Sequence, residues 1–236
     1  MRKMSVLDLL YPRHCPLCGQ VRPFGEGTAC DECMKQAEWV REPACMKCGK
    51  PILYEEAEYC QDCVRLPKSY VRGFPVFVYR TSVQEAVAAM KYQNQRVYAD
   101  FFADCMAARY GETLAGLGID GLVPVPVHKN RRRRRGYNQA EVLARCLGRR
   151  INRPVYPDFL RRIRDTEPQK ELNDRQRLEN IKSAFKIGEN RIKLEQVLLV
   201  DDIYTTGATV EACTRVLLAA GVKKVYYTSV AIGKGY

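Results

Sequence analysis

One stretch of the sequence decides the fold, Val197-Leu-Leu-Val-Asp201-Asp202-Ile-Tyr-Thr205-Thr206-Gly207-Ala208-Thr209. Its four leading apolar residues are typical of a central strand that is covered on both faces. Two acids follow, and then a loop of hydroxyl groups with one glycine leads into a helix expected over 209–220. Free amides at a helix N-terminus, the helix dipole and threonine hydroxyls can together hold a phosphate. Since the two acids can accept hydrogen bonds from vicinal ribose hydroxyls, the segment predicts a site for a ribose phosphate.

Strands and helices alternate through the chain beyond residue 66. Further strands are expected at 74–79, 122–127 and 224–232. Ser82 and Glu85 form the pattern of a capping box that opens a helix, and Asn138 can cap another. This β-α-β order predicts an α/β fold with a mostly parallel sheet and a ligand site at the carboxyl ends of its strands. We therefore expect a small cysteine-rich module over 1–66 and an α/β domain over 67–236.

Eight of the 11 cysteines form four C-x-x-C pairs at a regular interval near the N-terminus. The pairs are Cys15/Cys18, Cys30/Cys33, Cys45/Cys48 and Cys60/Cys63. One such pair can hold an ion from a tight turn, and a second pair completes the tetrahedron that Zn²⁺ accepts. The spacing therefore predicts two structural zinc sites with four cysteines each. It leaves two arrangements open, consecutive pairs or a cross-braced pairing of the first pair with the third and the second with the fourth.

The other three cysteines, Cys105, Cys146 and Cys213, have apolar helical neighbours and are expected in the core. An odd number of cysteines with metal-type spacing is typical of a reducing compartment. No apolar run approaches the roughly 20 residues of a transmembrane helix, and the N-terminus lacks the pattern of a cleaved signal peptide. These features predict a soluble, unprocessed, cytoplasmic protein without membrane insertion. With 46% hydrophobic residues, wholly disordered and collagen-like chains are excluded.

The positive charge is concentrated in one region. The formal net charge is +12, and the span from His128 to Arg164 contains 13 lysines and arginines but only two acids, Glu141 and Asp158. Such a region predicts an anionic partner, either the phosphates of a small ligand, a nucleic-acid backbone, or both. Arg135 lies just before an expected helix start, where its guanidinium, the free amides and the helix dipole would converge on one anion.

The segment 197–209 closely resembles the phosphoribosyl pyrophosphate (PRPP) motif of type I phosphoribosyltransferases, which has apolar residues, two acids and a Thr-Thr-Gly-x-Thr/Ser loop. Three further motifs stand before it, VPVPVHKNRRRRRGYNQAEVLA (123–144), Thr166-x-x-Gln169-x-x-Leu172 and Arg177-x-x-Asn180-x-x-x-Ala184-Phe185. Together they resemble the ComF competence family, also called ComF/GntX. Its members place a cysteine-rich zinc module before a phosphoribosyltransferase-like domain, and the resemblance covers essentially the whole chain.

The resemblance implies a role for each matching position. Asp201 and Asp202 would bind the ribose of PRPP, which such enzymes take together with Mg²⁺. The 5′-phosphate would bind at Thr205, Thr206, Gly207, Ala208 and Thr209. The place where these enzymes grip pyrophosphate corresponds to His128, Lys129 and Arg135, by position and character more than by identical letters.

The family resemblance also implies a role in DNA uptake and natural transformation, with single-stranded DNA as ligand and a helicase-like ATPase as partner. The basic region suits this role because arginines can meet phosphates while bases stack on interleaved aromatic rings. The expected nucleic-acid residues are Arg131, Arg132, Arg133, Arg134 and Tyr137, with Tyr156 and Phe159 nearby. The alternative for the four arginines is a solvated loop.

A second function remains open, an active phosphoribosyltransferase that transfers ribose 5-phosphate from PRPP to an unidentified nucleobase-like acceptor. In the related enzymes, Mg²⁺ and basic groups neutralise the departing pyrophosphate. The sequence identifies neither an acceptor site nor a catalytic residue. The polar stretch 166–180 is either a flap that closes over the bound anion or a plain surface excursion.

Overall fold

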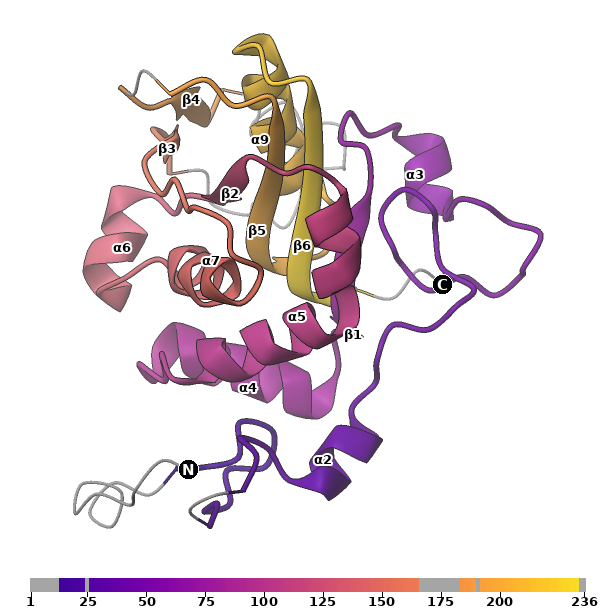
Figure 1. Ribbon diagram of the computed structural model, residues 1–236, viewed down its shortest axis with the longest axis vertical. Coiled ribbons are helices and arrows are strands. Elements are labelled where there is room, and N and C mark those ends of the chain that lie inside the picture. The colour runs from indigo at the N-terminus through magenta and orange to yellow at the C-terminus, as the bar shows by residue number, and fades with distance from the viewer. Residues whose placement is uncertain (1–12, 24–25, 166–182, 190–191, 234–236) are drawn as a thin grey trace.

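The computed structural model describes residues 13–23, 26–165, 183–189 and 192–233. Its centre is a parallel sheet of four strands in the order β1-β6-β5-β2 (Figure 1). The strands are β1 (Gly73–Val78), β2 (Gly121–Pro124), β5 (Gln196–Tyr204) and β6 (Lys224–Ile232). Every residue of β1 and β2 is buried, as expected for strands covered on both faces. The predicted α/β fold with a mostly parallel sheet is confirmed.

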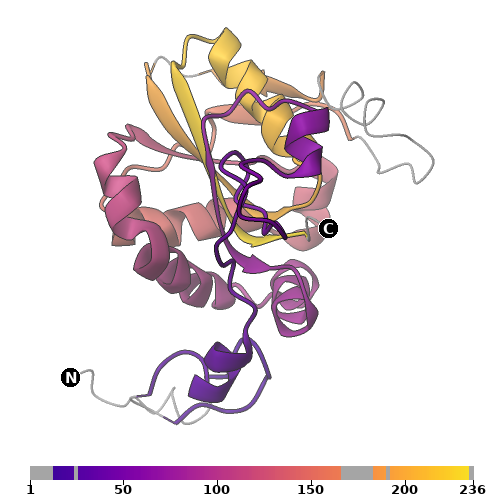
Figure 2. The same ribbon diagram turned by 90° about the vertical axis from the view of Figure 1, so that its right-hand side faces the viewer.

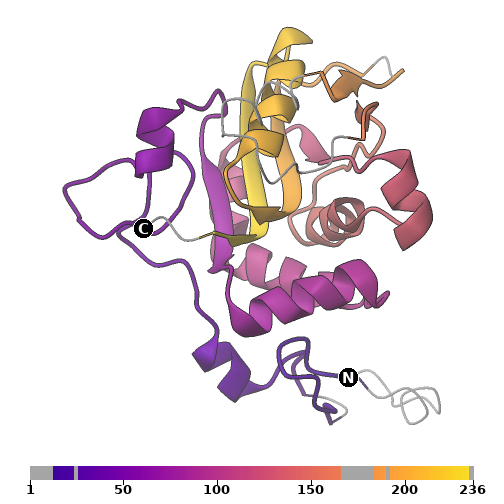
Figure 3. The ribbon, with the colours of Figure 1, turned by 180° about the vertical axis from the view of Figure 1, so that it is seen from behind.

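Helices cover both faces of this sheet (Figures 2 and 3). One face packs against α4 (Thr81–Tyr92), α5 (Tyr98–Gly116) and α7 (Gln139–Arg150). The other face packs against α9 (Ala208–Ala219). A small antiparallel sheet of two strands, β3 (Leu160–Arg162) and β4 (Phe185–Ile187), lies beside α9. Within the described ranges, no helix is long and apolar enough to cross a membrane.

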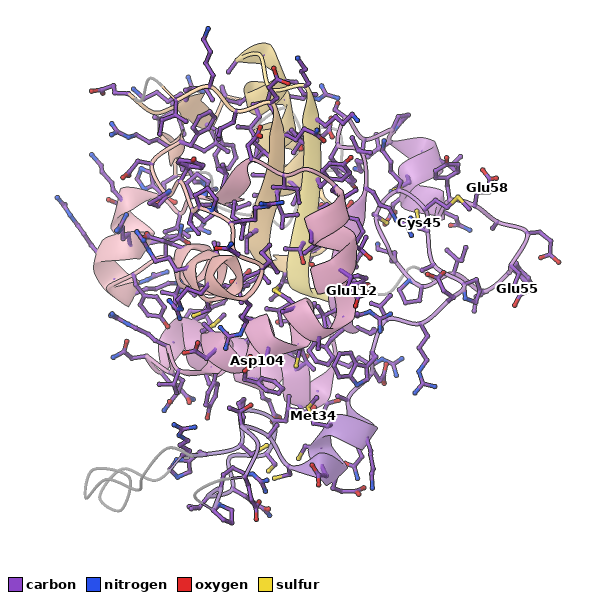
Figure 4. The ribbon with its side chains drawn as sticks, viewed as in Figure 1. Met34, Cys45, Glu55, Glu58, Asp104 and Glu112 are labelled. Carbon is purple, nitrogen blue, oxygen red and sulfur yellow. The ribbon has the colours of Figure 1, made fainter. Side chains whose placement is uncertain are left out.

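The cysteine-rich module does not form one body beside the α/β domain. Its first ribbon, which contains α2 (Asp31–Gln36), joins the core on the α5 face of the sheet. Its second ribbon, which contains α3 (Gln61–Arg65), joins the core on the α9 face. Figure 4 accordingly shows Met34 of the first ribbon below α5 and Cys45 of the second beside α3. The two ribbons therefore support different faces of the same sheet.

The chain between the ribbons protects the open edge of the sheet. The Val40 amide donates to the Val76 carbonyl at 2.9 Å, and the Val78 amide donates to the Glu38 carbonyl at 2.7 Å. Edge strands with unpaired backbone groups tend to pair with other chains. Residues 38–40 supply hydrogen-bond partners for backbone groups on this edge of β1.

Several boundaries differ from those expected from the sequence. Strand β2 ends at Pro124, because Pro124 and Pro126 lack the amide that a longer ladder needs. The capping-box prediction is wrong, since α4 begins at Thr81 after Arg80 and has no side-chain cap. Helix α5 was not predicted, although the expected core positions of Cys105, Cys146 and Cys213 are confirmed by their burial. The stretch 166–180 lies outside the described residues.

The arginine run forms a helix, α6 (Lys129–Arg135), and not the solvated loop considered from the sequence. Lysine and arginine are good helix formers. Gly136 ends the helix with φ at 79°, in the left-handed region that glycine enters readily. The predicted cap of α7 is confirmed, because the Asn138 side chain accepts the Ala140 amide at 3.2 Å.

Tight packing between β1 and β6 gives a test of the sheet. A Cβ atom at Gly73 would lie 2.2 Å from the Tyr227 ring, whereas a Cβ atom at Gly111 of α5 would meet nothing within 4 Å. We expect Gly73→Ala to destabilise the fold by about 2 kcal/mol, which lowers Tm by about 4–8 °C in a chain of this size. Gly111→Ala, the matched control, should raise stability by about 0.5–1 kcal/mol through helix propensity.

Thermal unfolding followed by circular dichroism compares the two variants. Equal Tm values for both would contradict the close contact between β1 and β6.

Candidate functional site

The eight predicted zinc ligands lie in two groups, Cys15, Cys18, Cys30 and Cys33, and Cys45, Cys48, Cys60 and Cys63. Within each group, the ligand atoms lie within 4.8 Å of one another. The Cys18 and Cys30 sulfurs are 3.7 Å apart, and the Cys48 and Cys60 sulfurs are 3.6 Å apart. A tetrahedral Zn²⁺ with Zn–S bonds of about 2.3 Å places its sulfurs about 3.8 Å apart. Both groups therefore fit zinc, and the pairs combine consecutively, not in the cross-braced order.

The turns that hold the sulfurs have the form of zinc knuckles. Gly19 and Gly49, each after the second cysteine of a pair, have φ angles of 75° and 73°. Burial and the neighbouring thiols raise the pKa of Cys33 to about 12, so the thiolates need a cation to coexist there. All four cysteines of the second group are buried, whereas Cys18 of the first group is exposed. The second zinc site is therefore the more enclosed one.

The two acids lie on the carboxyl-terminal part of β5, beyond its pairing with β2. The last register pair is Pro124 with Val200, so Asp201 and Asp202 follow the paired residues of β5. The Asp202 amide donates to the Asp201 carboxylate at 2.9 Å. Lys91, at the end of α4, places its ammonium 3.0 Å from the Asp202 carboxylate.

The charges of this group influence one another. Burial, together with the adjacent Asp202 carboxylate, raises the pKa of Asp201 to about 8. Burial alone would lower the pKa of Lys91, but the carboxylates of Asp202 and Asp201 outweigh it and hold that pKa above its ordinary value. Lys91 is therefore the resident counter-ion of the acidic pair. The sequence pattern of α4 did not predict this role for Lys91, because the contact depends on how α4 meets the end of β5.

The loop after the acids has the form of a phosphate cradle. Gly207 has φ at 76° and stands directly before α9, which no side chain of the described residues caps. The first amides of α9 are therefore open to an anion, and the helix dipole favours one there. Thr205 is exposed, while Thr206, Ala208 and Thr209 are half-buried around Gly207. The structure thus brings the two acids and the predicted phosphate loop to one end of the sheet.

Arg135 forms a second anion-compatible group at the end of α4. Its guanidinium lies 5.1 Å from the Tyr92 ring centroid and donates to the Gln139 side-chain oxygen at 3.2 Å. Arg135 Nε and Gln139 Nε2 are buried donors without an acceptor among the described residues. Since Lys91 and Tyr92 are consecutive, the end of α4 joins the acidic pair to this group. Sequence analysis did not select Gln139. Its place at the N-terminus of an expected helix, which favours anions, could have indicated it.

His128 and Lys129 do not join Arg135 in one cluster. His128 is buried, with Nδ1 3.1 Å from the Asp165 carboxylate, which also lies 3.4 Å from Arg131 Nε. The Nδ1 atom of His128 therefore faces Asp165, whereas Arg135 contacts Tyr92 and Gln139. Lys129 is exposed at the start of α6.

The expected nucleic-acid residues divide into two sets. Arg132, Arg133 and Arg134 are exposed on α6, and Arg131 is partly exposed. Tyr137 is buried instead, its hydroxyl donates to the Met90 carbonyl, and Arg96 lies 4.3 Å from its ring centroid. Phe159 is buried as well. The arginines are thus presented to a partner, but Tyr137 and Phe159 offer no ring on which a base could stack.

Comparisons with known proteins agree with this architecture. The family model described as a double zinc ribbon domain matches residues 6–64. The chain is 30% identical over 203 residues to Competence protein F of Haemophilus influenzae, covering 83% of this chain and 86% of that protein.

Two other curated relatives are similar over most of their length. DNA utilization protein YhgH of Escherichia coli is 27% identical over 220 residues, or 92% of this chain and 96% of that protein. Competence protein ComFC of Bacillus subtilis is 27% identical over 198 residues, or 81% of this chain and 78% of that protein.

The raised pKa of Asp201 predicts that Asp201→Asn stabilises the protein at alkaline pH. The pKa is about 8 in the folded state against an ordinary 3.8, so the folded chain keeps a proton that the unfolded chain releases between these values. The acid therefore destabilises the fold increasingly as pH rises through this range. Asparagine does not ionise and can still accept the Asp202 amide. We expect a gain of about 1 kcal/mol, or about 2–4 °C in Tm, at pH 8.5 and none at pH 4.

Melting curves of the wild type and Asp201→Asn at both pH values measure this difference. The same change in Tm at both, or a loss at pH 8.5, would show that Asp201 is ionised in the folded protein.

Proposed function

The chain belongs to the competence protein F (ComF) family, and on this premise we propose that it handles single-stranded DNA during DNA uptake and binds PRPP at the end of β5. The names of the relatives support the DNA role, since they are called competence and DNA utilization proteins. The observation that carries the PRPP site is the open N-terminus of α9, which follows directly on the acidic pair and Gly207.

Each part of PRPP has a complementary group in this arrangement. The 5′-phosphate would bind the free amides after Gly207 and the hydroxyls of the loop. The ribose hydroxyls would donate to Asp201 and Asp202, where they compete with the Lys91 ammonium that lies 3.0 Å from Asp202. The pyrophosphate would take the buried donors of Arg135 and Gln139, which have no acceptor within the described ranges. Both acids offer the oxygen ligands that Mg²⁺ prefers, and the ion would neutralise pyrophosphate charge.

Phosphoribosyl transfer is a second candidate function, favoured by the donors Arg135 Nε and Gln139 Nε2, which have no acceptor in the described part of the chain and could take a leaving pyrophosphate. In this reaction the bond from the anomeric carbon to the pyrophosphate oxygen breaks, and pyrophosphate leaves with the electron pair. A nitrogen of the acceptor base then forms the new bond to that carbon. Screening bases for pyrophosphate release with the zinc-loaded protein tests this candidate.

The DNA surface would be the exposed side of α6, extended by two arginines of α7. Arg145 and Arg149 have side chains that are 52% and 64% exposed, despite ion pairs with Glu141 and Asp100. Exposed pairs of this kind contribute little and can rearrange around a phosphate. A helicase-like ATPase partner and a cytoplasmic location complete the proposal, the first from the family resemblance and the second from the odd number and metal-type spacing of the cysteines.

The PRPP site predicts a loss of binding when the acidic pair is neutralised. Charge-assisted hydrogen bonds contribute about 1.5–3 kcal/mol each, so Asp201→Asn/Asp202→Asn should weaken PRPP binding at least about 100-fold. The matched control is Glu55→Gln/Glu56→Gln, an adjacent and exposed pair of acids in the second ribbon.

Calorimetric titration with PRPP and Mg²⁺ measures both variants beside the wild type. The PRPP assignment fails if the folded wild type does not bind, or if the aspartate variant binds as tightly as the control.

The DNA surface predicts a change in salt dependence. Neutralising Arg132, Arg133 and Arg134 to glutamine should weaken binding to an oligo-dT strand and reduce the slope of log K against log salt by about 2, since each phosphate contact contributes about 0.7 on single strands. A variant with Lys35, Lys223 and Lys224 changed to glutamine removes the same charge elsewhere on the surface.

Fluorescence anisotropy from 50 to 300 mM salt compares the two triple variants. Equal slopes for both would place the DNA elsewhere on the molecule.

A further inference from the structure

The chain that leaves the second zinc ribbon braces the phosphate loop directly. Five residues after Cys63, the Lys68 ammonium donates to the Thr206 carbonyl at 3.2 Å. The Ser69 amide and hydroxyl both donate to the Glu211 carboxylate, at 2.7 and 2.8 Å. Glu211 is 1% exposed and lies in the first turn of α9. Residues 68 and 69 thus hold the loop on one side and the helix that follows it on the other.

Three buried tyrosines form a second connection beneath the loop. The hydroxyls of Tyr70 and Tyr204 are 2.8 Å apart. The Tyr204 ring stacks on the Tyr227 ring, with centroids 4.8 Å apart and planes 12° apart. All three side chains are buried.

This tyrosine stack ends at a zinc ligand. The Tyr227 hydroxyl donates to the backbone carbonyl of Cys48 at 2.6 Å. The second ribbon is also fixed to β1, since the Gly73 amide donates to the Lys47 carbonyl at 2.9 Å. Within the ribbon, the buried Lys50 ammonium lies 2.6 Å from Asp62, which precedes the zinc ligand Cys63 in the sequence.

At its other end, the stack determines the position of Gly207. A Cβ atom on Gly207 would lie 2.0 Å from the Tyr204 hydroxyl, so the loop backbone rests directly on that ring. A shift of Tyr204 would therefore move the amides that face the phosphate. Contacts run without interruption from a ligand of the second zinc to the loop.

The first ribbon has no such connection among the contacts of the described residues. It packs with α5 on the opposite face of the sheet, in the core that contains Phe101 and Phe102. The two zinc sites therefore provide an internal comparison, one connected to the loop and one remote from it.

We propose that the second zinc site is a structural part of the phosphate loop, so that zinc occupancy at Cys45, Cys48, Cys60 and Cys63 and phosphate-ester binding strengthen each other, while the first zinc site is independent. Zinc binding contributes its free energy to the folding of the second ribbon, from which the chain continues directly to Lys68 and Tyr70. By linkage, bound ligand must raise the affinity of the protein for this zinc by the same factor by which bound zinc raises the affinity for the ligand. Such factors are typically about 5–150-fold. As far as PRPP is the ligand, the inference rests on the proposed function.

Zinc release tests the coupling with a readout other than turnover. Cys30→Ser/Cys33→Ser leaves only the second site, and Cys60→Ser/Cys63→Ser leaves only the first. With a zinc-selective chromogenic chelator, we expect PRPP and Mg²⁺ to slow release at least about 5-fold from the former and not from the latter. Unchanged release from the second site, in protein that binds PRPP by calorimetry, would overturn the coupling.

Tyr70→Phe tests the same connection without removing a zinc site, in case the cysteine variants do not fold. It removes one hydroxyl and leaves all eight zinc ligands in place. We expect a protein with two zinc ions per chain, at least about 5-fold weaker PRPP binding and a smaller effect of PRPP on zinc release. Wild-type affinity together with the full effect on release would contradict the role of the tyrosine stack.

A measurement without ligand separates this inference from the PRPP assignment. Hydrogen exchange of the hydrogen-bonded amides that open α9, beginning with Glu211, which donates to the Gly207 carbonyl at 2.8 Å, should accelerate when zinc is removed from the second site and stay unchanged when it is removed from the first. If PRPP does not bind the wild type, the proposed function fails while this result still decides the coupling. No acceleration on loss of the second zinc would refute it.

Discussion

The contact between Gly207 and the Tyr204 ring is the constraint on which the site depends. It places a left-handed residue, with φ at 76°, against a hydroxyl that any Cβ atom would strike. The ring cannot move freely, because it is held between Tyr70 and Tyr227. The start of α9 is therefore fixed before any ligand arrives, and its open amides face one direction. Preorganisation of this kind lowers the cost of binding an anion.

Electrostatics organises the other half of the site. The Lys91 ammonium pairs with the Asp202 carboxylate, and burial beside that carboxylate raises the pKa of Asp201 to about 8. A ligand with ribose hydroxyls and its cation would replace Lys91 as the partner of these acids. The same helix end carries Tyr92, which lies against Arg135. The C-terminus of α4 thus connects the acids to the donors proposed for pyrophosphate.

Local sequence patterns predicted the elements whose structure is set locally. The apolar run 197–200, the loop around Gly207 and the C-x-x-C pairs are each determined by residues close together in the sequence. The strand and both four-cysteine groups were therefore predicted correctly. Contacts between distant segments were not predictable in this way. Lys91 reaches Asp202, and Ser69 reaches Glu211, only because the sheet order places them together. For the same reason, the burial of Tyr137 under Arg96 could not be read from the arginine-rich stretch.

A crystal structure of the zinc-loaded protein with PRPP and Mg²⁺ tests the central claim most directly. The account predicts the 5′-phosphate on the amides of 205–209, the ribose hydroxyls on Asp201 and Asp202, and the Lys91 ammonium displaced from Asp202. A ligand bound elsewhere, or one that leaves the ion pair between Lys91 and Asp202 intact, would contradict it.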